Sequence, residues 1–209
     1  MNKDSYSHRY ERKYIVPFKN QSLISKFLIC SQMRFTPQYE ERVVNSIYLD
    51  TSKLQFFYEN MNGLSRRKKF RIRWYGNPDY ITNPVLEVKL KNGNLGRKII
   101  SPIDYYQNSN LIFDIKQITK SLKQINASKN LSETLNYLKP NLFVSYTRTY
   151  FKSKVLECRL TIDREIKYKS INIQTNSIKN LHNNKNLILE LKYPFKIDSE
   201  KISSLFNFP

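Results

Sequence analysis

The chain has 209 residues, of which 40% are hydrophobic, and its 36 Lys and Arg residues outnumber 17 Asp and Glu residues to give a formal net charge of +19. That hydrophobic content is too high for a disordered tail, so we expect one folded domain over residues 1–209. The excess of positive charge indicates a polyanionic partner, namely nucleic acid, an anionic membrane or a phosphate-rich molecule.

Cysteine usage and the amino-terminal segment argue against several other classes of protein. Cys30 and Cys158 are far apart in the sequence, which disfavours a disulfide framework or a zinc site. Residues 1–14 lack the apolar core of a secretory signal, and no stretch of the sequence has the length of a membrane span. We therefore expect a cytoplasmic location.

The expected elements alternate between strands and helices along the chain. Segments rich in β-branched and aromatic residues predict strands at residues 9–16, 43–50, 66–75, 84–91, 95–101, 142–151, 155–163 and 187–193. Apolar spacing predicts helices at 18–32, 52–60 and 198–206, and two more within 110–138 with a break near 126–130. Asn92-Gly93-Asn94 predicts a tight hairpin, and the polar stretch 170–186 predicts a loop. The predicted fold class is α+β with a mostly antiparallel sheet.

Several predicted strands carry charges on one side and apolar residues on the other. Residues 85–93 (VLEVKLKNG) place Glu87, Lys89 and Lys91 on one face of a strand, because successive side chains point to opposite faces. Residues 70–75 (FRIRWY) do the same with Arg71 and Arg73. The pattern Glu-x-Lys recurs on three strands, at residues 11–13, 87–89 and 190–192.

Two architectures fit this alternation. In an open sheet the charged face meets solvent, which is the commoner arrangement. In a closed barrel of about eight strands the charged faces meet inside, around a small ligand. The recurrence of Arg and Lys favours the second arrangement, since packed like charges are costly without a compensating anion. Arg also matches phosphate oxygens with its planar fork, while Lys supplies a point charge.

Seven segments, in this order, resemble those of VTC domains, the polyphosphate polymerase module of the vacuolar transporter chaperone complex. They are residues 11–14 (ERKY), 46–51 (SIYLDT), 70–75 (FRIRWY), 86–89 (LEVK), 146–148 (YTR), 159–163 (RLTID) and 189–192 (LELK). VTC domains belong to the triphosphate tunnel metalloenzymes, relatives of the CYTH phosphatases and cyclases. The resemblance covers residues 9 to about 194.

The resemblance implies an eight-stranded antiparallel β-barrel, a triphosphate tunnel, with helices packed outside and a carboxy-terminal helix at 198–206. It also implies transfer of the γ-phosphate of ATP to a growing inorganic polyphosphate chain, with Mn²⁺ or Mg²⁺ as the cofactor. ATP and polyphosphate are the expected partners, nucleic acid is not expected, and a membrane protein outside this chain is a further candidate partner.

The resemblance assigns roles to ten positions. The family's catalytic cations match Arg71, Arg73, Lys89, Arg148 and Arg159. Substrate-binding positions match Lys13, Lys98, Tyr146 and Lys192, and the metal-binding acid matches Glu190. Within Gly96-Arg97-Lys98-Ile99 the register is ambiguous, so Arg97 is an equal candidate to Lys98.

One departure from the family pattern keeps other functions open. Family members carry a Ser-Lys pair in the last helix, whereas this sequence has Lys201-Ile202-Ser203-Ser204 there. The departure weakens the expectation of polymerase activity more than that of the fold. The alternatives are a triphosphatase of the same fold and a noncatalytic module that binds polyphosphate or nucleotides.

Overall fold

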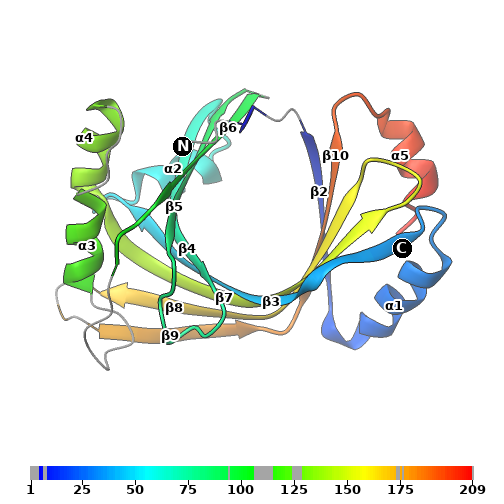
Figure 1. The fold of residues 1–209 in the computed structure, drawn as a ribbon, viewed down its shortest axis with the longest axis horizontal. Coiled ribbons are helices and arrows are strands. Elements are labelled where there is room, and N and C mark those ends of the chain that lie inside the picture. Colours follow the sequence, from blue (N-terminus) through cyan, green and yellow to red (C-terminus); the bar gives the residue numbers. More distant parts are fainter. Residues whose placement is uncertain are drawn as a thin grey trace. The chain divides into compact units, whose positions relative to one another are not determined.

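The computed structural model describes residues 5–6, 9–93, 95–105, 115–123, 129–172, 175 and 177–208 (Figure 1). The strands are β1 (Ser5–Tyr6), β2 (Arg9–Val16), β3 (Phe35–Asp50), β4 (Arg66–Tyr75), β5 (Val85–Asn92), β6 (Leu95–Pro102), β7 (Lys139–Ser153), β8 (Arg159–Asn172), β9 (Ser177–Asn184) and β10 (Leu187–Pro194). The helices are the short 3₁₀ helix η1 (Phe18–Asn20), α1 (Gln21–Cys30), α2 (Gln55–Met61), α3 (Ile115–Lys123), α4 (Lys129–Tyr137) and α5 (Ser199–Leu205). None of the helices within these ranges is both long enough and apolar enough to cross a bilayer.

The strands form a hydrogen-bonded sheet in the order β1-β6-β5-β4-β3-β7-β8-β10-β2, with β9 paired to β8. The pairings β4–β5, β5–β6, β3–β4, β10–β8 and β10–β2 are antiparallel. The expected antiparallel fold with accompanying helices is therefore confirmed. Among the described residues, hydrogen bonds do not join β1 to β2, so they leave the sheet open at those two ends.

The chain divides into two compact units. The first unit comprises β1, Val43–Ser145 and Lys167–His182, and the second comprises residues 9–42, Tyr146–Ile166 and 183–208. Each unit has its own apolar core, and the strands β3, β7 and β8 contribute residues to both cores or their surroundings.

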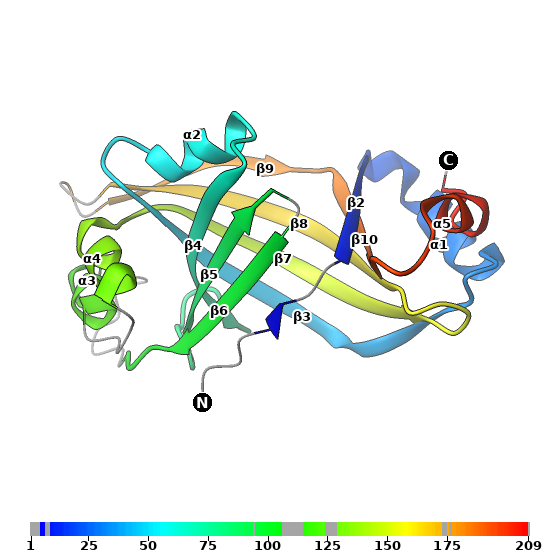
Figure 2. The same ribbon diagram turned by 90° about the horizontal axis from the view of Figure 1, so that it is seen from above.

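In the first unit, one face of the sheet packs against α2, α3 and α4. Figure 2 shows β4, β5 and β6 side by side, as their antiparallel registers require. The ring of Phe70 on β4 lies 4.9 Å from the ring of Phe56 on α2, and Trp74 stacks on Phe143 at 5.8 Å. The side chains that were predicted to form the apolar face of β4 and β5 are buried in this core, namely Phe70, Ile72, Trp74, Leu86 and Val88.

A buried carboxylate fixes the start of α2. Asp50 accepts hydrogen bonds from the backbone N–H groups of Thr51, Phe56 and Phe57, at 2.7, 3.0 and 2.8 Å. The bonds from Phe56 and Phe57 satisfy N–H groups that the first turn of a helix leaves without partners. The helix consequently begins at Gln55, a few residues later than the sequence predicts.

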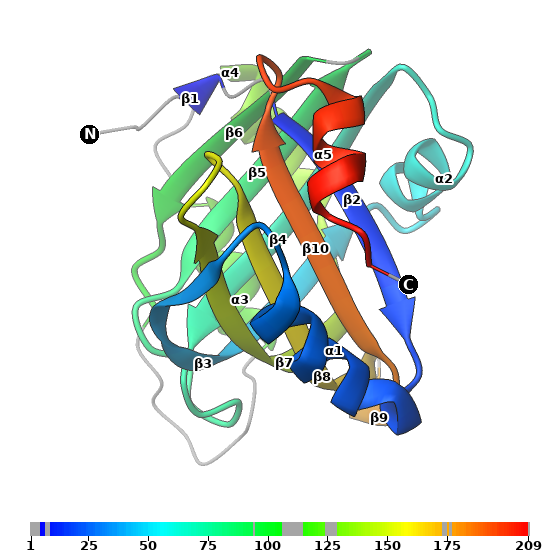
Figure 3. The same ribbon diagram turned by 90° about the vertical axis from the view of Figure 1, so that its right-hand side faces the viewer.

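In the second unit, α1 and α5 cover the apolar faces of β10 and β2 (Figure 3). Ile24 of α1 and Ile202 of α5 share a core with Leu189 and Leu191 of β10. Arg12 projects to the same side as α5, where it donates hydrogen bonds to Tyr193, Ser199 and Ser203. The predicted carboxy-terminal helix is confirmed, and Asp198 caps it by accepting from Glu200 N–H at 3.0 Å.

Three predicted boundaries are wrong, for identifiable reasons. The predicted loop 170–186 contains the end of β8 and the strand β9, whose polar residues Lys179 and Asn180 are exposed, so this strand lacks an apolar signal. β3 begins at Phe35 rather than residue 43, because its first half is polar and exposed. β8 begins at Arg159 rather than residue 155, since Ser153 Oγ accepts from the N–H groups of Val155 and Leu156 and closes a turn.

Two other predictions concern residues close to undescribed segments. The hairpin after β5 is confirmed by the pairing of Asn92 with Leu95 and by the left-handed backbone of Gly93, although Asn94 lies outside the described residues. The two helices expected within 110–138 are present as α3 and α4. Residues 110–114 and most of the predicted break near 126–130 lie outside the described residues.

Candidate functional site

The first unit gathers three cations around one buried carboxylate, in a group that we call the Glu87 cluster (Arg71, Arg73, Glu87 and Lys98). Arg71 donates from Nε to Glu87 Oε2 at 2.7 Å, and its Nη2 lies 2.6 Å from the same oxygen. Arg73 Nη1 and Lys98 Nζ both reach Oε1, at 3.1 and 2.7 Å. Glu87 is only 5% exposed, so this carboxylate exchanges its water shell for three cationic partners.

The cluster forms because β4, β5 and β6 present the same parity to one face. Arg71 lies opposite Glu87 in the register of β4 and β5, and Lys89 lies between Lys69 and Lys98 in the register of the three strands. The cluster lies on the face opposite the apolar core, because Phe70, Ile72, Leu86 and Val88 occupy the alternate positions.

The same register decides between Arg97 and Lys98. Lys98 pairs with Lys89 and bonds to Glu87, so it lies on the charged face. Arg97 pairs with Leu90, on the parity that packs toward the core.

Positive charge exceeds negative charge in the Glu87 cluster. Burial raises the pKa of Glu87, but the charge of Arg71 and the hydrogen bond and charge of Lys98 outweigh burial, and the net pKa is lowered. The carboxylate therefore stays ionised and can neutralise only one of its three cations. Arg73 Nε is buried and has no hydrogen-bond partner among the described residues, so this guanidinium makes fewer hydrogen bonds than it can donate.

The second unit contains a second charged group, which we call the Glu190 cluster (Lys13, Arg148, Asp163, Glu190 and Lys192). Lys192 Nζ lies 2.6 Å from Glu190 Oε1, whereas Lys13 Nζ and Arg148 Nη2 both lie 3.9 Å from Oε2. Lys13 pairs with Glu190 in the register of β2 and β10, and Thr161 of β8 pairs with Glu190 from the other side.

In this cluster Arg148 forms an ion pair with the carboxylate of Asp163. Its Nε and Nη2 bind the two oxygens of Asp163 at 2.5 and 2.6 Å, a bidentate geometry that fixes the guanidinium plane. Its Cζ lies 5.0 Å from the centre of the Tyr146 ring, a cation–π contact. Burial lowers the pKa of Arg148, but the bonds to Asp163 outweigh burial and raise it, so the arginine remains charged.

Glu190 also remains ionised. Burial raises its pKa, and the charges of Lys192, Lys13 and Arg148 outweigh that effect and lower it overall. Arg159, another predicted site residue, pairs with Lys192 in the register of β8 and β10 and is exposed. The structure thus brings Lys13, Tyr146, Arg148 and Lys192 close to Glu190 or to one another, and leaves Arg159 at the edge of the group.

The residues of the Glu190 cluster fit a divalent metal that arrives with a substrate. Among the described residues no group of three or more His, Cys, Asp or Glu side chains could hold a metal by itself. Mg²⁺, however, usually takes one or two carboxylates and completes its shell with water and substrate phosphates. The carboxylate of Glu190 suits that role, because Lys13 and Arg148 approach its Oε2 only to 3.9 Å, whereas Lys192 binds Oε1.

Two acids that organise the clusters were not among the ten positions assigned from the sequence. Glu87 occupies the Glu-x-Lys pattern of the fourth predicted strand, and Asp163 ends the RLTID segment, so both lie within segments that carried a signal. The pattern identifies their face but not their partners. Only the cross-strand register shows that Glu87 meets Arg71 and that Asp163 lies where Arg148 can reach it.

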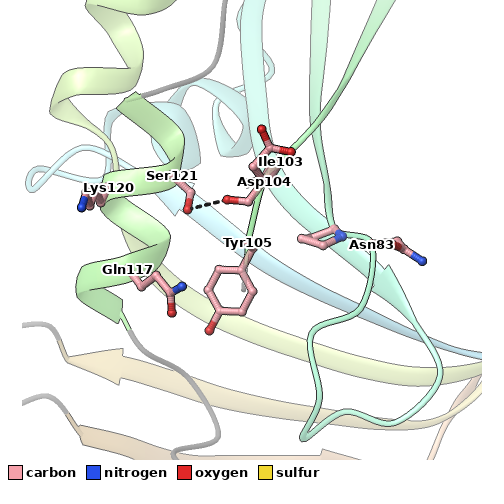
Figure 4. A pocket seen from close by; sticks show the side chains of 8 residues that line it. Asn83, Ile103, Asp104, Tyr105, Gln117, Lys120 and Ser121 are labelled. Carbon is pink, nitrogen blue, oxygen red and sulfur yellow. Dashed lines mark hydrogen bonds between the residues drawn. The ribbon is translucent and has the colours of Figure 1, made fainter. Parts of the chain in front are cut away.

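A separate cleft of about 470 Å³ lies in the first unit, beside α3 (Figure 4). Its lining includes Asn83, Asp104, Tyr105 and Lys120, and Ser121 Oγ donates to the carbonyl of Asp104 at 3.0 Å. None of the ten predicted site residues lines this cleft. The cleft therefore contributes nothing to the charged clusters.

Comparison with solved structures shows the same fold in two bacterial proteins. A proposed adenylate cyclase from Bacillus halodurans aligns with a TM-score of 0.51 and 11% identity, over 98% of this chain and 87% of the other. A proposed adenylate cyclase from Vibrio parahaemolyticus aligns with a TM-score of 0.51 and 11% identity, over 97% and 84% of the two chains. No curated protein matches the sequence.

At the level of sequence families, the model of the VTC domain matches residues 8–207. This range contains both charged clusters and all ten positions assigned from the sequence. The match spans nearly the whole chain, and the fold agrees with the antiparallel architecture expected from the sequence motifs. The chain therefore belongs to the VTC domain family.

Proposed function

We propose that this chain is a metal-dependent phosphotransferase that moves the γ-phosphate of ATP onto a growing inorganic polyphosphate chain. The observation that supports the proposal most is the Glu87 cluster, in which one buried carboxylate is surrounded by three cations. Such an arrangement leaves net positive charge on a preformed, partly buried surface, which favours binding of phosphate oxygens. Because ATP is the donor, we propose that the reaction takes place in the cytoplasm.

The proposed reaction is a displacement at phosphorus. The bond between the γ-phosphorus and the β–γ bridging oxygen breaks, a bond forms to a terminal oxygen of polyphosphate, and ADP leaves. The attacking phosphate is already ionised, so the reaction requires no strong general base. Catalysis then depends on positioning and on neutralising charge at the phosphoryl oxygens. In the first unit Arg71, Arg73, Lys89 and Lys98 would carry out that neutralisation.

The second unit has a proposed metal ligand and phosphate-binding cations of its own. Glu190 would hold Mn²⁺ or Mg²⁺, whose positive charge would offset the charge of the phosphate oxygens. Lys13, Lys192 and Arg159 would bind phosphate oxygens. Asp163 would orient the guanidinium of Arg148 through its bidentate contact, so we treat Asp163 as a positioning residue.

Two alternatives share the same binding chemistry. A triphosphatase would use the same cations but deliver the γ-phosphate to water. A noncatalytic module would bind polyphosphate or nucleotides without turnover, and the absence of the family's Ser-Lys pair from the last helix favours it. Nucleic acid is not among the proposed partners, whereas a membrane protein that receives the polymer is.

The products formed from ATP distinguish these candidates. The purified chain is incubated with ATP, Mn²⁺ and a short polyphosphate primer, and the products are separated on a gel while free phosphate is assayed. A ladder of lengthening polyphosphate is expected. Free phosphate without a ladder would identify a triphosphatase. Tight binding of ATP or polyphosphate without either product would identify a noncatalytic module.

A further inference from the structure

Helix α2 of the first unit exposes an apolar stripe instead of a polar one. Leu54, Phe57, Tyr58, Met61 and Leu64 are between 37% and 68% exposed. Within the helix, Phe57 and Tyr58 lie four and three residues before Met61, a spacing that places the three side chains on one face, and Leu54 and Leu64 flank the helix at its two ends. An exposed face of large apolar residues at this spacing is typical of a surface that meets a membrane or another protein.

The stripe is not the result of a loosely attached helix. Phe56, on the opposite face of α2, is buried against Phe70. The carboxylate of Asp50 holds the first turn, and Asn60 Nδ2 donates to the carbonyl of Lys68 at 2.8 Å. The helix is therefore anchored to Asp50 of β3 at its start and to Lys68 of β4 near its end, and its outward face is fixed.

Basic residues flank the stripe on the same side of the sheet. In the run Arg66-Arg67-Lys68-Lys69, Lys68 pairs with Leu90 and shares its parity with Phe70, whereas Lys69 pairs with Lys89 on the charged face. Arg66 and Lys68 therefore project toward the side that bears α2, and both are exposed. Lys53, just before the helix, is exposed as well. None of these three cations forms an ion pair with a described carboxylate.

The acidic residue of α2, Glu59, does not offset the positive charge of these cations beside the stripe. The carboxylate of Glu59 accepts hydrogen bonds from Gln55 Nε2 at 3.0 Å and from the backbone N–H of Lys68 at 3.3 Å. The contact with Lys68 of β4 holds it on the flank of the helix that faces this strand. The stripe thus has apolar side chains along its centre and cations along its border.

We propose that this surface docks the chain onto an anionic lipid bilayer. Phe57, Tyr58 and Met61 would enter the headgroup region, while Lys53, Arg66 and Lys68 would contact lipid phosphates. Apolar insertion and electrostatic attraction are each weak, and stable membrane association generally combines the two. The proposal is independent of the phosphotransferase chemistry, because none of these residues belongs to either charged cluster.

Vesicle co-sedimentation with the full chain tests the proposal. The probes are vesicles of phosphatidylcholine alone and vesicles in which roughly a third of the lipid is phosphatidylserine, at several salt concentrations. The wild-type chain is expected to bind the anionic vesicles and to bind neutral vesicles at least tenfold more weakly. The variant Phe57→Ser/Met61→Ser is expected to lose at least tenfold in binding to anionic vesicles, since apolar insertion is removed.

This variant is informative because the whole chain is strongly basic. It carries the same net charge as the wild type, so binding by charge alone would leave the two chains equal and would refute the proposal. Tyr137→Ser/Leu181→Ser, which removes two exposed apolar residues elsewhere in the first unit, is the matched control and should bind like the wild type. Arg66→Gln/Lys68→Gln should weaken binding most strongly at low salt.

Other occupants of the stripe would give different results. Light scattering of the wild type and of Phe57→Ser/Met61→Ser reports whether the stripe joins two copies of the chain. A wild-type dimer that the variant dissolves, without vesicle binding by the wild type, would overturn the proposal in favour of self-association. Failure of the wild type to bind any vesicle as a monomer would also overturn it. Unchanged circular dichroism of the variant excludes unfolding as the cause of lost binding.

Discussion

The Glu87 and Glu190 clusters use the same residue types in different proportions. In the first unit three cations share one buried carboxylate, and Arg73 Nε has no partner among the described residues. In the second unit two buried acids are close to Arg148, and the guanidinium of Arg148 donates hydrogen bonds to both oxygens of Asp163. The first cluster therefore has spare positive charge, whereas the second has its strongest cation already neutralised.

This difference suggests a division of tasks between the clusters. The Glu87 cluster has three cations and one carboxylate, so we expect that cluster to contribute most to anion binding. In the Glu190 cluster, Lys13 and Arg148 approach Oε2 of Glu190 only to 3.9 Å, and Lys192 binds Oε1. We expect this second cluster to contribute more to metal binding than to affinity for the nucleotide.

The largest expected effect is on anion binding by the Glu87 cluster. Replacing Arg71 by Ala should weaken binding of ATP and tripolyphosphate by roughly a hundredfold, because it removes charge-assisted hydrogen bonds. Calorimetric titration measures the change. Arg66→Ala, on the same strand but the opposite parity, is the matched control and should bind as the wild type does. Equal affinities for Arg71→Ala and Arg66→Ala would remove Arg71 from the site.

A smaller effect is expected when the proposed metal ligand is changed. Glu190→Gln should raise the Mn²⁺ concentration needed for half-maximal turnover by about ten- to a hundredfold. Affinity for ATP measured without metal should change by less than about threefold, since the neighbouring cations remain. Glu157→Gln, at an exposed acid in the same unit, serves as the control. A metal requirement identical to that of the wild type would contradict the role given to Glu190.

A third test concerns the ion pair between Arg148 and Asp163. Asp163→Asn should lower the free energy of unfolding by about 2 kcal/mol, because a buried arginine loses its charged partner. The same variant should bind ATP a few fold more tightly at a temperature where it is folded, since Arg148 then becomes available to phosphate. Chemical denaturation and titration measure the two effects. If stability and affinity both stayed at wild-type values, the ion pair would have neither role.

The smallest expected effect concerns acid stability. The pKa of Glu87 is lowered in the folded chain, so the folded state binds fewer protons than the unfolded state between the folded pKa and about 4.3. Its stabilising contribution is therefore present above about pH 4.3 and is lost as the pH falls through the folded pKa. Glu87→Gln should reduce the slope of unfolding free energy against pH in that acidic range by up to about 1.4 kcal/mol per pH unit. An unchanged slope, measured by urea denaturation at several pH values, would show that Glu87 is not held ionised by its neighbours.

Much of the architecture is predictable from the sequence because strand parity is a local signal. The apolar positions Phe70, Ile72 and Trp74 are buried as the alternation predicts, and the charged positions lie on the other face. The strand β9 was not predicted, because its polar residues are exposed and its sequence lacks the alternation of apolar residues that marks a half-buried strand. The late start of α2 depends on Asp50, whose carboxylate reaches the N–H groups of Phe56 and Phe57 across a turn that no local pattern specifies.

The sequence predicts which face of the strands carries the candidate site, but it does not predict which side chains contact one another there. The motifs identify Arg71, Arg73 and Glu190, since each occupies the charged parity of its strand. The choice of Lys98 over Arg97 and the central position of Glu87 depend on the register between β5 and its neighbours. Register follows from pairing between distant segments, so a single sequence leaves such contacts open.

The most direct test of the proposed function follows the phosphates of ATP individually. ATP labelled at the γ-phosphate, or in parallel at the α-phosphate, is incubated with the chain, Mn²⁺ and a polyphosphate primer of defined length. The account predicts that the γ-label appears in polyphosphate one unit longer than the primer, while the α-label remains in ADP. Release of the γ-label only as free phosphate, or movement of the α-label into a cyclic nucleotide, would contradict phosphotransfer to polyphosphate.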